Sequence, residues 1–77
     1  MRYNYYVAIL HNDNTLKYVT KVDNASKMYF CENGKPALKM TSFKAEDLMT
    51  CMVANLRNAV VIKTPDYFIP YNNEVQK

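Results

Sequence analysis

The chain is poor in the residue types on which several kinds of function depend. Its 77 residues include one glycine, one histidine, two cysteines and no tryptophan. A single glycine cannot build the Gly-rich loops that cradle phosphates in nucleotide-binding proteins. One histidine, His11, and two widely separated cysteines, Cys31 and Cys51, match no zinc-ligand spacing. The sequence therefore predicts neither a metal site nor a bound cofactor.

A catalytic constellation is missing as well. His11 stands in a predicted exposed turn, and a nucleophile–base pair would require one of the cysteines to reach it in the folded chain. The adjacent carboxylates Glu46 and Asp47 are explained as negative charge near the start of a helix. We therefore expect no enzymatic activity and no small-molecule substrate.

Long apolar runs and blocks of like charge are also absent. No stretch approaches the 18 residues of a membrane span, and the N-terminal residues lack a signal-peptide layout. We therefore expect no membrane association and a cytoplasmic location. If a phage encodes the chain, this would be the cytoplasm of the host cell. Two cysteines are too few for a disulfide scaffold, so we interpret both as structural thiols, with Cys51 the more reactive.

Alternating apolar and β-branched residues predict five strands separated by turn residues. Their expected ranges are 3–10, 15–22, 27–32, about 35–40, and 59–63. In the second range, Lys17, Val19 and Lys21 are expected to share the wetter face of the strand. Asn33-Gly34 is the strongest hairpin signal, because a type I′ turn needs positive φ at both central positions.

One amphipathic helix is predicted between the last two strands. Its apolar stripe has the i, i+3, i+4 spacing of a helix and consists of Ala45, Leu48, Met49, Met52, Val53 and Leu56. Ser42 or Thr41 is expected as the N-cap, and Asn58 is expected to take a left-handed conformation at the C-terminal end. Arg57 is expected near the negative end of the helix dipole.

These elements predict an α+β fold with the order ββββαβ. An antiparallel-dominated sheet of four to five strands would carry the single helix on one face. Residues 1–65 are expected to form the domain, and residues 66–77 an aromatic and then polar C-terminal tail.

Aromatic residues are the positive functional signal. Seven tyrosines and three phenylalanines exceed what one small core can absorb, and tyrosine is enriched at protein interfaces. We therefore expect a protein-binding module or regulator that acts through an aromatic surface, as a homodimer. The expected binding residues are Tyr67, Phe68 and Tyr71 in the tail and Tyr3, Tyr5 and Tyr6 in the first strand. Whether the tail instead folds back over its own domain is left open.

Two further inferences come from composition. Lys17, Lys21 and Tyr6 could form a basic, stacking sheet face, so nucleic-acid binding is the alternative function.

The composition also bears on the source of the chain. Residues with AT-rich codons, Lys, Asn, Tyr, Ile and Phe, outnumber Gly, Ala, Arg and Pro by 30 to 12. This bias indicates a low-GC bacterium or a phage or mobile element of one, in which an inhibitor of a host protein would fit the small size.

Overall fold

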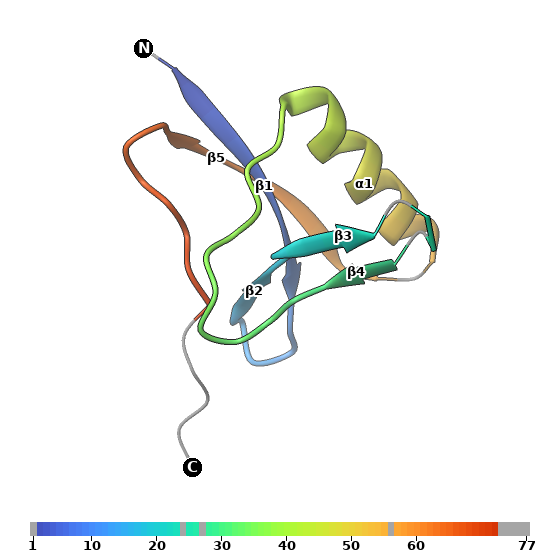
Figure 1. The fold of residues 1–77 in the computed structure, drawn as a ribbon. Coiled ribbons are helices and arrows are strands. Elements are labelled where there is room, and N and C mark those ends of the chain that lie inside the picture. Colours follow the sequence, from blue (N-terminus) through green and yellow to red (C-terminus); the bar gives the residue numbers. More distant parts are fainter. Residues whose placement is uncertain (1, 24, 27, 56, 73–77) are drawn as a thin grey trace.

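The predicted α+β fold, with element order ββββαβ, is confirmed in the computed structural model. It describes residues 2–23, 25–26, 28–55 and 57–72. The elements are β1 (Tyr3–Leu10), β2 (Leu16–Tyr18), β3 (Lys21–Asp23), β4 (Met28–Phe30), α1 (Ser42–Ala54) and β5 (Ala59–Pro65). They form a three-stranded antiparallel sheet in the order β2-β1-β5 and a separate antiparallel pair, β3-β4 (Figure 1).

The central strand is β1, which is aromatic and apolar along its whole length. It pairs with β5 from Tyr3 opposite Pro65 to Ile9 opposite Ala59, and with β2 through its last residues. A strand that is apolar on both sides is expected where both faces of a sheet are covered. Here α1 covers one face, and the chain after β5 crosses the other.

The predicted strand 15–22 is in fact two strands in two sheets. The N–H of Val19 still donates to β1, at 2.8 Å, whereas the N–H of Thr20 donates to β4, also at 2.8 Å. The chain changes sheets between these residues, and the alternation of faces is broken there. Val19 and Val22 both join the core, so the prediction that Lys17, Val19 and Lys21 share one wet face was wrong.

The predicted hairpin at Asn33-Gly34 was also wrong. Gly34 has a φ of 71°, as expected, but Asn33 does not have positive φ, so the turn is not type I′. Residues 35–40 form no strand and instead make isolated bridges to Tyr71 and Tyr5. The chain after Gly34 thus pairs with distant segments instead of returning along β4, which a reading of local turn signals cannot detect.

Helix α1 begins at one of its two predicted caps, Thr41, and Ser42 is its first helical residue. Thr41 is the N-cap, and its side chain accepts a hydrogen bond from the N–H of Lys44 at 3.3 Å. The first turn contains no acidic residue, so Glu46 and Asp47 lie beyond the N–H groups that carry most of the positive end of the dipole.

The C-terminal end of α1 comes earlier than predicted. Asn55 is the C-cap, and its side chain donates to the carbonyl of Cys51 at 2.9 Å. The helix therefore stops before Arg57, and no basic residue lies in its last turn. Asn58 does not take the left-handed conformation. Leu56, the last residue of the predicted stripe, lies outside the described residues.

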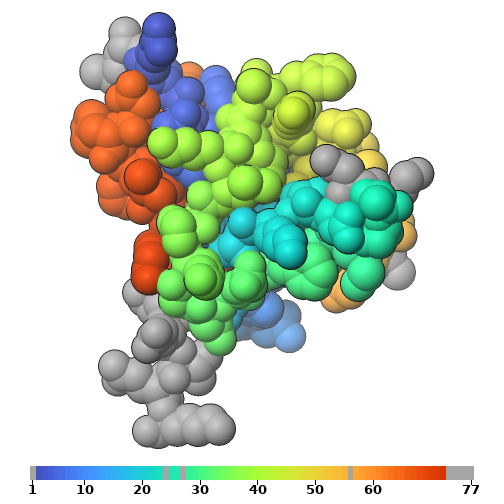
Figure 2. All heavy atoms as spheres, viewed as in Figure 1, coloured from blue at the N-terminus to red at the C-terminus, as the bar shows by residue number. Residues whose placement is uncertain are grey.

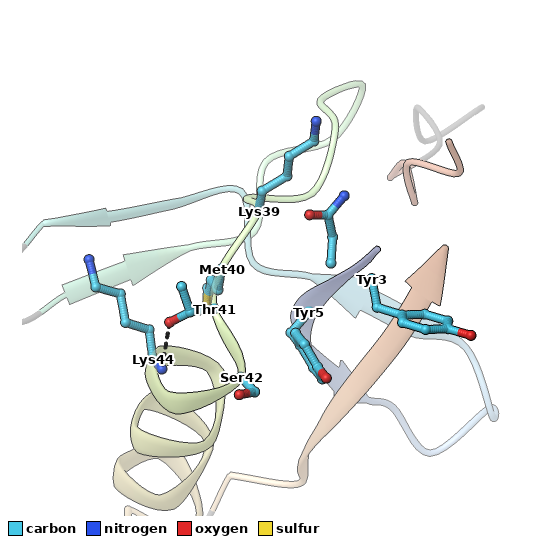
Figure 3. A pocket seen from close by; sticks show the side chains of 8 residues that line it. Tyr3, Tyr5, Lys39, Met40, Thr41, Ser42 and Lys44 are labelled. Atoms are coloured by element: carbon cyan, nitrogen blue, oxygen red, sulfur yellow. Dashed lines mark hydrogen bonds between the residues drawn. The ribbon is translucent and has the colours of Figure 1, made fainter. Parts of the chain in front are cut away.

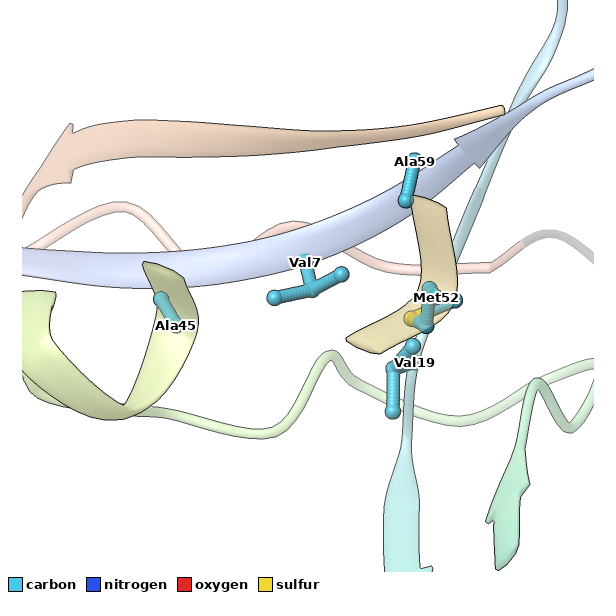
Figure 4. Close-up of a cluster of buried hydrophobic side chains, with 5 residues drawn as sticks. All are labelled: Val7, Val19, Ala45, Met52 and Ala59. Atoms are coloured by element: carbon cyan, nitrogen blue, oxygen red, sulfur yellow. The ribbon is translucent and has the colours of Figure 1, made fainter. Parts of the chain in front are cut away.

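The main core lies between α1 and the three-stranded sheet. Its buried centre consists of Val7, Val19, Ala45, Met52 and Ala59 (Figure 4). The β3-β4 pair closes this core from the β2 side through Val22 and Tyr29.

Residues 66–72 cross the opposite face of the sheet. Thr64, in β5, donates through its hydroxyl to the carbonyl of Phe68 at 3.2 Å. At the other end, Asn72 hydrogen-bonds to the backbone of Tyr18 in β2. The segment thus runs from one outer strand to the other, and β1 residue Tyr6 beneath it is fully buried. In Figure 2 the loop that leads to α1 (green) lies between this segment (orange-red) and the β3-β4 pair (teal).

Candidate protein-binding surface

The most prominent exposed apolar feature follows β5, in residues 67–71, which we call the aromatic segment. The exposed fractions of its large side chains are 81% for Tyr67, 53% for Phe68, 48% for Ile69 and 53% for Tyr71. Large exposed apolar side chains gathered within one short segment are typical of sites that contact another macromolecule.

The backbone of the aromatic segment is held in place at both ends. The N–H of Phe68 donates to the carbonyl of Pro65 at 3.0 Å, and the carbonyl of Pro70 accepts from the N–H of Ala37 at 2.9 Å. The hydroxyl of Tyr71 donates to the carbonyl of Gly34 at 2.6 Å. The exposed side chains therefore project from a fixed backbone, which reduces the ordering entropy lost on binding.

The three tyrosines of β1 do not join this surface as a group. Tyr6 is fully buried, so it cannot contact a partner in this structure, and Tyr5 is half-buried against the core. Tyr3 is exposed, and the ammonium of Lys63 lies 4.3 Å from the centre of its ring. Strand alternation places Tyr3 and Tyr5 on the helix side of the sheet, away from the face that the C-terminal segment crosses. Figure 3 shows both tyrosines beside a shallow hollow of about 510 Å³ next to the start of α1.

A second apolar surface was not predicted. A groove of about 750 Å³ lies between α1 and the β3-β4 pair. Met28 and Phe43 contribute exposed apolar surface to its lining, and Lys39 and Lys44 contribute positive charge. Phe43 is the second residue of α1, is 79% exposed and does not belong to the apolar stripe of the helix. A large apolar residue outside the stripe was the signal in the sequence for a second apolar surface.

The residues proposed for nucleic-acid binding are separated in the structure. Lys17 lies in β2 and Lys21 in β3, in different sheets. The ammonium of Lys21 lies 5.6 Å from the ring centre of Phe30, which is exposed. Tyr6 is buried and on the face opposite Lys17, because Lys17 pairs with Ile9 across the β1-β2 ladder.

The two cysteine thiols and the Asp13 carboxyl lie in different surroundings. Burial raises the pKa of the Cys31 thiol, although the charge of Lys17 opposes that shift, whereas Cys51 is exposed. Hydrogen bonds from the hydroxyl and N–H of Thr15 lower the pKa of the Asp13 carboxyl in the exposed turn that contains His11. Among the residues that the structure describes, no three His, Cys, Asp or Glu side chains cluster in a way that could hold a metal ion. No helix in the same residues has the length and apolar character needed to span a membrane.

Comparison with known proteins identifies no relative. The chain matches no protein-family model, no curated protein and no solved structure. The function therefore has to be argued from the surfaces of this chain.

Proposed function

We propose that this chain is a small, non-catalytic protein-binding module or regulator that acts through the aromatic segment. One combination carries the proposal: four large apolar side chains are exposed, while hydrogen bonds fix the backbone on either side of them. Free-standing apolar side chains of this size would otherwise be expected to collapse onto the domain. Tyrosine and phenylalanine also lose little conformational entropy when a partner immobilises them.

The segment defines the chemistry of a partner. No charged residue occurs between Tyr67 and Tyr71, and Asp66 precedes the segment. We therefore expect an apolar pocket on the partner that takes the rings of Tyr67 and Phe68. A polar group at the rim of that pocket would hydrogen-bond to the hydroxyl of Tyr67.

A cytoplasmic location and a source in a low-GC bacterium, or in a phage or mobile element of one, belong to the same proposal. Composition alone supports the source. A lysate of a low-GC bacterium is therefore the first sample in which to search for the partner. We expect that partner to be a host protein.

Photo-crosslinking tests the proposal, with a matched control in the same chain. A benzophenone amino acid replaces Tyr67 in one version and Phe43, of almost equal exposure, in the other. We expect a discrete crosslinked protein from position 67 and none from position 43. Phe68→Ala should then weaken binding of the identified protein at least tenfold, because truncation of a buried aromatic anchor commonly costs 2 kcal/mol or more. Isothermal titration would measure that loss.

Two outcomes would contradict the proposal. Crosslinking from position 43 alone would move the binding site to the groove beside α1. Binding to mixed-sequence single-stranded DNA that falls steeply between two salt concentrations would favour the nucleic-acid alternative, because phosphate contacts release counterions.

A further inference from the structure

The outer edge of β5 is the longest strand edge that the described residues leave unpaired. β1 lies between β2 and β5, so β5 has a hydrogen-bonded neighbour on one side only. Its seven residues, Ala59–Pro65, are mostly apolar and include one charge, Lys63. A row of unpaired backbone groups on such a strand is a template for pairing with another chain.

The hydrogen bonds of β1 show which backbone groups of β5 point outward. Tyr5 exchanges two hydrogen bonds, of 3.2 and 2.9 Å, with Met40 on the side of β1 away from β5. Because backbone groups alternate in an antiparallel ladder, Lys63, which is opposite Tyr5, turns its own N–H and C=O away from β1. The groups of Ala59 and Val61 point the same way. Within the described residues, no hydrogen bond from another segment reaches these three residues.

The opposite edge of the same sheet is capped at Tyr18. The side chain of Asn72 accepts from the N–H of Tyr18 and donates to its carbonyl, both at 2.8 Å. These are the two bonds that a residue of a neighbouring strand would make. One edge of the sheet is thus capped by a side chain, whereas the longer edge is open.

We propose that two copies of this chain dimerise by antiparallel pairing of their β5 strands, with Val61 on the two-fold axis. In this register Val61 faces Val61 of the second copy, and Ala59 faces Lys63. Each facing pair exchanges two hydrogen bonds, so every outward N–H and C=O of these residues gains a partner. The result is one continuous sheet in the order β2-β1-β5-β5-β1-β2.

Two other registers, centred on Lys63 and on Ile62, are worse. An axis through Lys63 would place two ammonium groups side by side, which is destabilising. An axis through Ile62 would set Ala59 opposite Pro65, which has no N–H to donate. The register centred on Val61 avoids both problems.

The pairing also brings apolar side chains together. Val60 faces Ile62 of the second copy on the sheet face away from α1. On the other face, α1 packs against both β1 and β5, so the two-fold axis would place both helices on the same face of the joined sheet. Val53 is half exposed and lies about 160° round α1 from Cys51, which lines the groove toward β3-β4. It is therefore on the β5 side of the helix.

Disulfide trapping tests the register in the full chain, with Cys31 and Cys51 replaced by alanine. A single cysteine introduced by Val61→Cys would face itself across the axis, with Cα atoms about 5.5 Å apart, within disulfide range. The matched variant Lys63→Cys would leave the Cα atoms of its two cysteines roughly 14 Å apart, too far to bond. We expect mild oxidation to crosslink position 61 and not position 63. Crosslinking at 63, or at neither position, would overturn the proposal.

Light scattering tests the dimer itself. We expect a mass near twice 9.0 kDa at micromolar concentration for the natural chain and near 9.0 kDa for Val61→Pro. Proline at this position removes an outward N–H, which an edge strand tolerates, and also replaces a side chain that packs against the core, so circular dichroism would report whether the fold persists. A natural chain that is monomeric throughout, or a folded Val61→Pro chain that stays dimeric, would refute β5 pairing. If Val61→Pro does not fold, the trapping result at positions 61 and 63 decides.

The same assay separates this dimer from the proposed function. Phe68→Ala should keep the dimer mass, because Phe68 lies outside β5. If this variant becomes monomeric while remaining folded, the aromatic segment is the self-association surface and β5 pairing is wrong. Loss of partner binding without loss of the dimer would leave both proposals standing.

Discussion

Tyr6 lies on the face of β1 turned away from α1, and none of its surface reaches solvent. Its hydroxyl has no hydrogen-bond partner within the described part of the chain. A buried hydroxyl without a partner loses its hydration and gains nothing in return. This single atom therefore opposes folding, while the ring around it fills the space under the C-terminal segment.

Tyr6→Phe removes that hydroxyl and keeps the ring, so we expect the free energy of unfolding to rise by about 1 kcal/mol. Urea denaturation at neutral pH would measure the change. Tyr67→Phe is the matched control, because that hydroxyl is open to water and its loss should change stability little. A drop in stability for Tyr6→Phe would mean that the hydroxyl has a hydrogen-bond partner.

At the scale of the element, α1 carries an unfavourable charge in its first turn. Lys44 lies three residues after the N-cap Thr41, where the partial positive charge of the helix N-terminus is concentrated. The same position in a capping box is occupied by Glu or Gln, whose side chain reaches back to the N–H of the cap residue. The helix thus has the hydrogen bond from the Lys44 N–H to the Thr41 side chain, but Lys44 cannot make the reciprocal bond and carries a positive charge where a negative one is favourable.

Lys44→Glu should therefore stabilise the chain by about 0.5–1 kcal/mol, through the completed box and the favourable dipole interaction. Thermal denaturation at low ionic strength would show the gain, and added salt should reduce it. Lys35→Glu makes the same change of net charge in a loop and serves as the control. An equal gain from both variants would assign the effect to net charge instead of the helix end.

At the scale of the whole molecule, Asn72 joins three segments that are far apart in the sequence. Its side chain bonds to both backbone groups of Tyr18 and donates to the carbonyl of Glu32 at 3.0 Å. Its own N–H donates to the carbonyl of Lys35, and its carbonyl accepts from the N–H of Gly34. This residue closes the β2 edge and anchors the segment that covers Tyr6.

Asn72→Ala removes the side-chain partners of the Tyr18 N–H, the Tyr18 carbonyl and the Glu32 carbonyl, so we expect a loss of roughly 2–3 kcal/mol in the free energy of unfolding. Urea denaturation measures the loss, and Asn33→Ala, at an exposed asparagine, should change it by less than about 0.5 kcal/mol. Comparable effects from both variants would show that the Asn72 side chain does not hold the segment.

The whole-molecule scale also shows where prediction from sequence stopped. The strand at 3–10 and the position of the helix followed from periodicity, because side chains repeat every two residues in a strand and every 3.6 in a helix. The prediction that Tyr6 lies at a binding surface was wrong, because Tyr6 is fully buried. β1 is apolar on both sides, and that was the available signal that a second layer covers it.

The sequence by itself determined the α+β class, the element order, a helix N-cap at Ser42 or Thr41 and the positive φ of Gly34. Each depends on residues within a few positions of one another. Tertiary structure alone decided that the predicted strand 15–22 is divided between two sheets, that Asn72 closes the β2 edge and that the edge of β5 is open. Those outcomes depend on hydrogen bonds between segments as many as 54 residues apart, which local propensity and spacing do not encode.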